Sequence, residues 1–238
     1  MQTKALFDRY YYSNPAFRDG TKTFHRLCAR HFPAGARILE IGPGPRNKTS
    51  DFLNSFVEVV GVDVSPEIQA NPALTAAYVY DGRWLPFRDR CFDGCVSNYV
   101  AEHLTDPECH FREVARVLRP GGVYCLRTPN LWHYVTIGSR LLPHRFHLRW
   151  ANRLRSLSEA HDPYPTYYRL NTGPKIVRSA QAAGLQPVQL DYIEAEPFYG
   201  RCHAALFYPM MLYERLVNAA VFLAPFRMNI LAVVAKTA

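Results

Sequence analysis

A short glycine turn, Gly42-Pro43-Gly44, is the first place where residue types and spacing could do chemistry. It follows an apolar run that contains the carboxylate Glu40, and its glycines leave room for a ligand to lie against the backbone. A second carboxylate, Asp63, ends the next apolar run about 20 residues further on, the spacing at which an acid meets the hydroxyl pair of a ribose in nucleotide-binding α/β proteins. Together these features predict a nucleoside site.

The residues after the turn indicate which nucleoside it suits. A dinucleotide loop carries a third glycine, and that position is Asn47 here, with the bulky Pro45 and Arg46 before it. Such a loop would hold a pyrophosphate poorly. S-adenosylmethionine has no phosphate, and its cationic end suits a turn led by the acidic Glu40. The pattern therefore favours S-adenosylmethionine over NAD.

The elements that must position these residues are short apolar strands alternating with helical patterns. The strand candidates are Ala36–Ile41, Val57–Val64, Ala76–Tyr80, Phe92–Asn98, Gly122–Thr128, Gln186–Ile193 and Asn229–Lys236. The helical patterns are Thr49–Ser55, Pro107–Val117 and Pro174–Ala183. Because the early strands are nearly all apolar, the alternation predicts a mostly parallel sheet with helices on both faces. Ligands of such sheets bind at the carboxyl ends of the strands.

Five motifs also occur in the order and spacing of a known family. They are Ile38–Gly44, Gly61–Asp63, Asp81–Phe87, Phe92–Leu104 and Arg116–Gly122. On these motifs residues 36–130 resemble the class I S-adenosylmethionine-dependent methyltransferase superfamily, within it the branch that methylates small molecules. The resemblance implies a Rossmann-like α/β fold with a seven-stranded sheet whose last strand is antiparallel. It also implies S-adenosyl-L-methionine as the cofactor.

The resemblance assigns roles around that cofactor. The glycine turn with Glu40 would line the methionine end, Asp63 would hold the ribose hydroxyls, and Asp81 with the Gly82 backbone would read the adenine edge. A plain turn at Asp81-Gly82 is the alternative. Many relatives carry a glycine where this chain has Arg46, whose role stays open. The predicted cofactor-binding residues are Glu40, Gly42, Gly44, Asp63, Val64, Asp81, Gly82, Arg83, Asn98 and Tyr99.

The acceptor side begins at Asn98-Tyr99, which the resemblance places beside the methyl group. The chain lacks the Asn-Pro-Pro-Tyr sequence typical of enzymes that methylate exocyclic or amide nitrogens, so we expect an oxygen acceptor. His103 is the predicted catalytic base, since an imidazole can remove the acceptor's proton, and Glu102 could orient it. A purely structural role for this triplet is the alternative. Glu102 and His103 could supply two ligands of a metal site, but no third is evident, so no metal is predicted.

Two later segments, rich in aromatic and basic residues, are predicted to form the acceptor pocket. His133 and His144 lie in the first segment, and Tyr168 and Arg169 lie in the second. An imidazole is a common structural group, but the density of histidines after a strand that ends at the ligand side favours contact with substrate. The tyrosine and arginine could close on a polar or anionic acceptor.

Length and composition predict a single domain over residues 1–238. Within it we expect an N-terminal lid or helical region at 1–30 and acceptor-side insertions at 131–170 and 197–226. The net charge of +8 comes from scattered bases without a dense run, so no nucleic-acid partner is predicted. The cysteines lack zinc-site spacing. The N-terminus shows no export signal, which favours a cytoplasmic location, and the oligomeric state is not predicted.

The stretch 204–225 is unusually apolar for a connection between strands. Glu214, Arg215, Asn218 and Pro209 argue against a transmembrane span. It is predicted either to pack on the core as a helix, or to form a lid for a hydrophobic acceptor, or to make a peripheral contact with an anionic membrane. Two other functions stay open beside methyl transfer: an NAD(P)-dependent oxidoreductase, and a non-catalytic partner subunit that keeps the nucleoside pocket.

Overall fold

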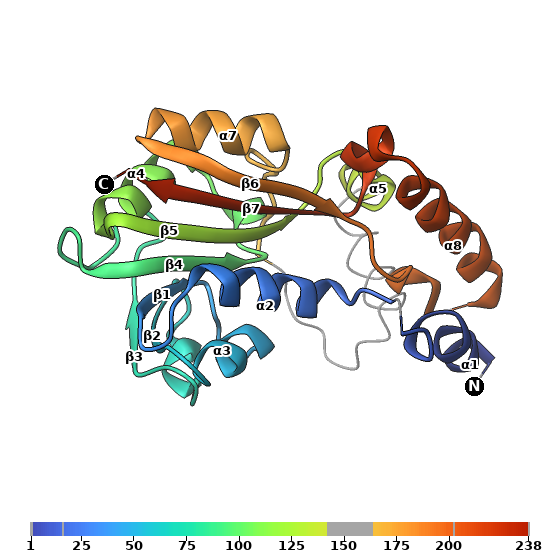
Figure 1. The fold of residues 1–238 in the computed structure, drawn as a ribbon, viewed down its shortest axis with the longest axis horizontal. Helices are drawn as coiled ribbons and strands as arrows, with labels where there is room; N and C mark the ends of the chain where they lie inside the picture. The colour runs from blue at the N-terminus through green and yellow to red at the C-terminus, as the bar shows by residue number, and fades with distance from the viewer. Residues whose placement is uncertain (1, 16, 142–163, 202, 238) are drawn as a thin grey trace. The chain divides into compact units, whose positions relative to one another are not determined.

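The computed structural model describes residues 2–15, 17–141, 164–201 and 203–237, and Figure 1 shows it as a ribbon. Its described strands form one seven-stranded sheet in the order β3-β2-β1-β4-β5-β7-β6. Strand β7 runs against its neighbours, as its arrow in Figure 1 shows. The strands are β1 Arg37–Ile41, β2 Glu58–Asp63, β3 Ala76–Val79, β4 Phe92–Asn98, β5 Leu118–Pro129, β6 Leu185–Ile193 and β7 Asn229–Lys236.

The core of the sheet lies along its central parallel strands. In the register of β1, Ile38 pairs with Val59 of β2 on one side and with Gly94 of β4 on the other. Ile38 and Val59 are fully buried. Strands covered on both faces need such continuous apolar sequences, which is why their positions could be predicted.

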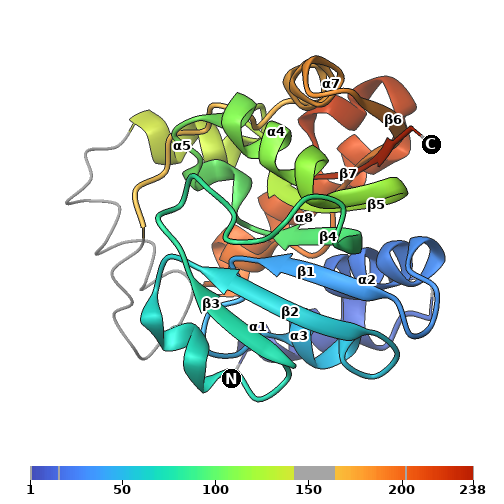
Figure 2. The ribbon, with the colours of Figure 1, turned by 90° about the vertical axis from the view of Figure 1, so that its left-hand side faces the viewer.

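Helices cover both faces of the sheet, with α2 and α3 on one face and α4 and α7 on the other (Figure 2). Helix α4 begins where it does because Asp106 accepts a hydrogen bond from the Cys109 amide at 2.9 Å and Pro107 occupies the first turn. The elements around the sheet are α2 Gly20–His31, α3 Lys48–Leu53, η2 Pro66–Ala70, η3 Ala101–His103, α4 Pro107–Val117 and α7 Gly173–Ala182.

The chain divides into two compact units. Unit 1 comprises 1–20, 130–164 and 192–229, and unit 2 comprises 21–129, 165–191 and 230–238. Unit 1 thus draws on the segments predicted as an N-terminal region and acceptor-side insertions. That all 238 residues act as a single domain stays a prediction. The elements of unit 1 are α1 Gln2–Phe7, η1 Asp8–Tyr12, α5 Tyr134–Leu141, η4 Phe198–Arg201, α8 Ala204–Ala219 and η5 Val221–Phe226.

Unit 1 has a small aromatic core of its own. Phe7, Tyr11 and Phe207 are buried against one another, and the rings of Phe7 and Phe207 meet edge to face at 5.0 Å. The Tyr11 hydroxyl donates to Glu214 Oε2 at 3.1 Å. The N-terminal helical region therefore packs on α8, the helix that forms within the apolar stretch 204–225.

The predicted fold class is confirmed, and the strands and helices whose bounds were predicted differ from the structure only at their ends. Strand β4, helix α4 and strand β7 have the predicted bounds. Strand β5 begins at Leu118 rather than Gly122, because Leu118 already pairs with Phe92 before a register shift. The Pro-Gly-Gly sequence, which looked like a boundary, is an irregularity within the strand, where Gly121 adopts a φ of 76°.

Candidate cofactor and acceptor site

The two glycines of the turn after β1 lack a side chain for different structural reasons. Both adopt left-handed φ angles, 72° at Gly42 and 64° at Gly44. A Cβ on Gly42 would lie 2.4 Å from Cγ2 of Val100, whereas a Cβ on Gly44 would meet no atom within 4 Å. Gly42 is therefore required by packing. Gly44 instead leaves open space beside the backbone, where a ligand could lie.

Asp63 ties this turn to the end of β2. The Gly44 amide donates to Asp63 Oδ2 at 2.9 Å, and the Ser65 amide donates to Oδ1 at 2.9 Å. Asp63 is 8% exposed, so its carboxylate sits at the edge of the core with both oxygens fixed by backbone donors. Each oxygen retains a second lone pair that could accept from a hydroxyl of a ligand.

Asn47, noted in the sequence only as a missing glycine, is the N-cap of α3. Its Oδ1 accepts from the amides of Thr49 at 2.7 Å and Ser50 at 2.9 Å. Its Nδ2 donates to the Pro43 carbonyl at 2.7 Å, which fixes the glycine turn. Because the side chain already occupies these helix amides, they are not available to a pyrophosphate, which binds to such groups in dinucleotide sites. The preference for helix-capping asparagine could have identified this residue.

Glu40 is turned into the protein rather than toward the turn's open side. It is 2% exposed and accepts from Ser50 Oγ at 2.7 Å and from Asn47 Nδ2 at 3.3 Å. Burial raises the pKa of Glu40 to about 7, against the lowering effect of these two donors. Asn71, which the sequence did not indicate, extends the network by donating to the Gly44 carbonyl at 3.1 Å.

A pocket follows the end of β3, and it brings the predicted adenine side together with the turn before α4 and the first residues of α4. Its lining residues are Asp81, Gly82, Arg83, Leu104, Thr105, Asp106, Cys109 and His110. Asp81 Oδ1 accepts from the amides of Arg83 and Trp84, both at 2.8 Å, and these bonds lower the pKa of Asp81. Val64 is 44% exposed, and a Cβ on Gly82 would lie 3.2 Å from its Cγ1. An exposed apolar side chain beside a glycine offers an apolar surface for a base.

Long-range hydrogen bonds hold the segment that carries Asp81. Glu113 Oε2 accepts from the Leu85 amide at 2.8 Å. Arg116 donates to the carbonyls of Phe87 at 2.7 Å and Leu85 at 3.0 Å. Arg116 also pairs with Glu113, which lowers the pKa of Glu113. Two of the sequence motifs, Asp81–Phe87 and the one that begins at Arg116, are thus physically connected.

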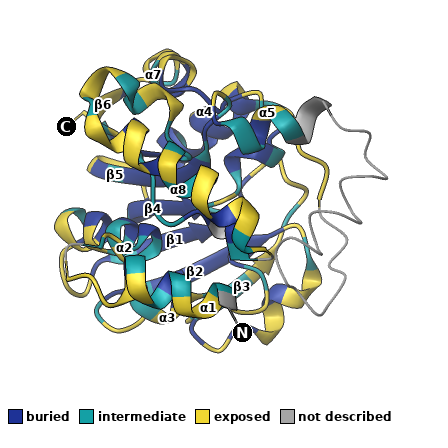
Figure 3. Cartoon of the chain, turned by 90° about the vertical axis from the view of Figure 1, so that its right-hand side faces the viewer, coloured by how far each residue is buried: buried dark blue, intermediate teal, exposed yellow. Residues whose placement is uncertain are grey.

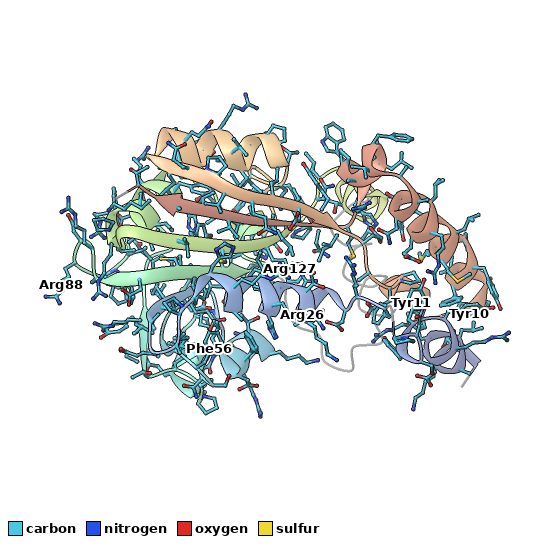
Figure 4. The ribbon with its side chains drawn as sticks, in the orientation of Figure 1. Tyr10, Tyr11, Arg26, Phe56, Arg88 and Arg127 are labelled. Atoms are coloured by element: carbon cyan, nitrogen blue, oxygen red, sulfur yellow. The ribbon has the colours of Figure 1, made fainter. Side chains whose placement is uncertain are left out.

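The end of β4 carries strain and an unpaired polar atom. Tyr99 adopts a φ of 60°, which is uncommon for a residue other than glycine. Arg127 lies over its ring at 4.7 Å from the ring centre, and Figure 4 labels this arginine. Asn98 Nδ2 donates to Thr49 Oγ1 at 3.1 Å, but its buried Oδ1 has no hydrogen-bond partner among the described residues. Strain and an unpaired buried acceptor are typical of a site that a ligand completes.

The predicted base lies against the segment 165–169. His103 Nδ1 is 2.9 Å from the Pro165 carbonyl oxygen. Since a carbonyl only accepts, the proton must sit on Nδ1, and Nε2 holds the lone pair of the neutral ring. Tyr168 and Arg169 of the same segment lie beside the turn that carries His103. The Tyr168 amide donates to the Glu102 carbonyl at 3.1 Å, and the Arg169 side chain donates to the Thr105 carbonyl. The structure therefore brings three predicted acceptor-side residues together.

Glu102 helps to hold the turn that carries His103 against the segment 165–171. It is 5% exposed, and its Oε2 accepts from Thr128 Oγ1 at 3.1 Å. Asn171 Nδ2 donates to Thr128 Oγ1 at 2.7 Å, so a buried chain links Glu102 to the end of the 165–171 segment. Burial raises the pKa of Glu102 to about 7. Asn171 was not indicated by the sequence, because the fold alone brings it to Thr128.

The remaining predicted residues are placed elsewhere. His133 belongs to unit 1, where it is 1% exposed, accepts from the Val135 amide at 3.3 Å and lies 3.5 Å from Glu194 Oε2. His144 lies outside the described residues. Arg46 lies on the surface, 3.8 Å from Asp51. Within the described ranges, no group of three or more histidine, cysteine, aspartate or glutamate side chains could hold a metal ion.

The glycine turn yields a prediction about stability. Gly44→Ala should cost only the left-handed backbone penalty of about 1–2 kcal/mol. Gly42→Ala should cost more, because its new Cβ would meet the Val100 side chain at 2.4 Å. Urea denaturation measures both free energies of unfolding. Adding Val100→Ala should recover part of the loss in the Gly42 variant and none in the Gly44 variant; equal recovery in both would contradict the packing explanation.

Glu102 yields a prediction about pH. Its folded pKa of about 7 lies above the ordinary 4.5, so the folded state binds more protons and its stability falls as the pH rises from 4.5 to 7. Glu102→Gln keeps the acceptor for Thr128 and removes the titration. The variant should therefore gain stability relative to the parent across this range, by on the order of 3 kcal/mol. Unfolding free energies at several pH values measure the difference, and a constant difference would refute the assignment.

Comparison with known proteins agrees with this geometry. A family model described as a methyltransferase domain matches residues 39–126. An uncharacterized methyltransferase of Mycobacterium sp. (strain JLS) is 41% identical over 98 residues, which are 40% of this chain and 39% of that protein. The matched stretch therefore spans about two fifths of the curated relatives' length.

Two solved structures share the fold at low identity. One comes from a complex that contains the Haloferax volcanii Trm112 methyltransferase activator, with a TM-score of 0.63 and 18% identity over 100% of this chain and 93% of that one. The other is geranyl diphosphate C-methyltransferase from Streptomyces coelicolor, with a TM-score of 0.57 and 15% identity over 91% and 81%. Residues 39–126 of this chain thus match a methyltransferase domain, and the fold is one that solved methyltransferases share.

Proposed function

We propose that this protein transfers the methyl group of S-adenosylmethionine to an oxygen atom of a small molecule. The observation that carries the proposal is the open space at Gly44, directly beside the Asp63 carboxylate, within the matched methyltransferase domain. The cofactor supplies a methyl group already activated on a sulfonium. The protein's task is therefore to align donor and acceptor and to manage the acceptor's proton.

The described residues fit this cofactor at three places. Asp63 has lone pairs for the ribose hydroxyls, and the pocket beside Asp81 and Val64 offers a carboxylate and an apolar surface for the adenine. The unpaired Oδ1 of Asn98 offers an acceptor for an ammonium group. Glu40 contributes indirectly, since its carboxylate orders the turn through Ser50 and Asn47.

The oxygen acceptor is supported by His103. With its proton fixed on Nδ1 by Pro165, the ring presents Nε2 as a base for a hydroxyl proton. Removing that proton makes the oxygen a stronger nucleophile. Arg169 lies over the Tyr167 ring at 5.5 Å and gives this side a positive charge, which suits a polar or anionic acceptor.

The rival functions are less well supported. A dinucleotide cofactor would need the helix amides that Asn47 occupies. A non-catalytic partner subunit would bind S-adenosylmethionine without turnover. Release of S-adenosylhomocysteine from a mixture with candidate hydroxylated acceptors supports the enzyme, while binding without any turnover supports the partner subunit.

Asp63 provides the test of cofactor binding. Asp63→Asn should weaken S-adenosylhomocysteine binding by about 1–3 kcal/mol, because it removes the charge and replaces one of the two oxygens, which accept from Gly44 and Ser65, by a donor. Isothermal titration calorimetry measures the affinity. Asp191→Asn is the matched control, since Asp191 lies on β6 and binds only Gln189 among the interactions described. Unchanged affinity in a folded Asp63→Asn protein would remove Asp63 from the site.

His103 provides the test of proton removal. His103→Ala should lower turnover about 100-fold, as the loss of a general base typically does, and should leave S-adenosylhomocysteine affinity unchanged. A coupled assay of S-adenosylhomocysteine release gives the rate, and His31→Ala at the end of α2 serves as the control. Turnover within a few fold of the parent would exclude His103 as the base.

A further inference from the structure

Helix α8 exposes more apolar residues than an ordinary surface helix does, and it buries a carboxylate. Its buried face contains Phe207, Val217 and the charged Glu214, whose carboxylate accepts from Tyr11 at 3.1 Å and from Asn218 at 2.8 Å. Its exposed residues are mainly apolar: Ala205, Leu206, Tyr208, Pro209, Leu212, Leu216 and Ala219. Figure 3 shows the long exposed side of this helix. The hydrophobic effect opposes such an arrangement unless another apolar phase covers it.

The apolar surface continues beyond the helix. Leu212 and Leu216 lie one helical turn apart and are 70% and 58% exposed. After Ala220 the chain enters η5, in which no residue is buried, and Val221 and Phe222 are 87% and 79% exposed. We call Tyr208, Leu212, Leu216, Val221 and Phe222 the α8–η5 face.

In unit 1 the described acidic residues are more deeply buried than several of the basic residues. Its described acidic residues are all buried or half-buried: Asp8, Asp19, Glu194, Glu196 and Glu214. Four described basic residues are exposed: Lys4, Arg9, Arg18 and Arg215. Arg215 belongs to α8 itself, where its exposed side chain lies 3.3 Å from Glu214 Oε2 and over the Tyr11 ring. In the part of unit 1 that the structure describes, apolar side chains and cations are therefore the exposed groups, while the carboxylates are buried or half-buried.

We propose that the α8–η5 face binds the surface of an anionic lipid bilayer. Apolar side chains would enter the headgroup region while the exposed bases attract anionic lipids. A second copy of the chain is the less suitable occupant, because a two-fold contact would bring the same cations together without exposed acids to pair with them. No described helix is long and apolar enough to span a bilayer, and a helix lying on the surface does not need to be. This inference does not depend on methyl transfer.

Vesicle co-sedimentation of the full chain at low salt tests the proposal. We expect binding to vesicles that contain phosphatidylglycerol and weaker binding to phosphatidylcholine alone. Leu212→Gln with Leu216→Gln should weaken binding at least about tenfold, because two leucines no longer enter the lipid. Arg215→Gln should weaken binding to the anionic vesicles about fivefold and should have little effect on neutral ones.

A matched control separates the face from general surface hydrophobicity. Val188→Gln removes an aliphatic side chain that is 53% exposed on β6 in unit 2, and it should leave vesicle binding unchanged. Circular dichroism and thermal unfolding check that each variant folds. Absence of binding to anionic vesicles, or binding that the double variant does not change, would overturn the proposal. A dimer that the double variant dissociates, without vesicle binding, would overturn it in favour of self-association.

Discussion

The rest of the cofactor side depends on the hydrogen bonds that Asn47 makes at the start of α3. One amide side chain caps the helix with its oxygen and holds the Pro43 carbonyl with its nitrogen. Glu40, buried beneath it, joins through Ser50. Because these groups are desolvated, each would be costly if left unpaired, and the network therefore allows one shape of the turn. In that shape the Gly44 amide and carbonyl are bonded to Asp63 and Asn71, while the space beside its Cα is open.

A second constraint governs the acceptor side. The turn after β4 receives the 165–171 segment through backbone and side-chain hydrogen bonds from Pro165, Tyr168 and Asn171. A carboxylic acid with a raised pKa, Glu102, lies under this contact. Segments distant in sequence thus define the surroundings of His103, including which of its nitrogens carries the proton. The strained Tyr99 precedes this turn. The end of β5 holds Tyr99 in place, since the Tyr99 amide donates to the Arg127 carbonyl at 2.9 Å.

Unit 1 follows different physical rules from the sheet. Its helix α8 buries the carboxylate of Glu214 against Tyr11 and exposes leucines, whereas helix α4 of unit 2 buries the apolar residues Phe111, Val114 and Val117. Stability inside unit 1 comes from aromatic contacts around Phe207 and from paired acids. An outward apolar face is retained where it serves an interaction, because exposure alone brings no stability.

The sequence by itself determined that the chain forms a mostly parallel sheet. It also determined which loops follow the carboxyl ends of the strands, where a ligand binds. Continuous apolar runs specify buried parallel strands, and parallel strands place their carboxyl ends on one edge, so Gly42, Gly44, Asp63 and Asp81 could be assigned to one region. These signals are local and periodic, which is why the bounds of β4, α4 and β7 were correct.

Only the tertiary structure decided what the side chains contact. Glu40 turned inward, His133 lies buried beside Glu194, and Asn71 and Asn171 entered hydrogen-bond networks that no sequence spacing indicates. The direction of α8 was undecidable from its composition, because its apolar residues exceed what one buried face requires and the partner of Glu214 lies about 200 positions away in the chain. Hydrogen-bond partners and burial depend on packing between distant segments, and a local pattern contains no information about which of them will meet.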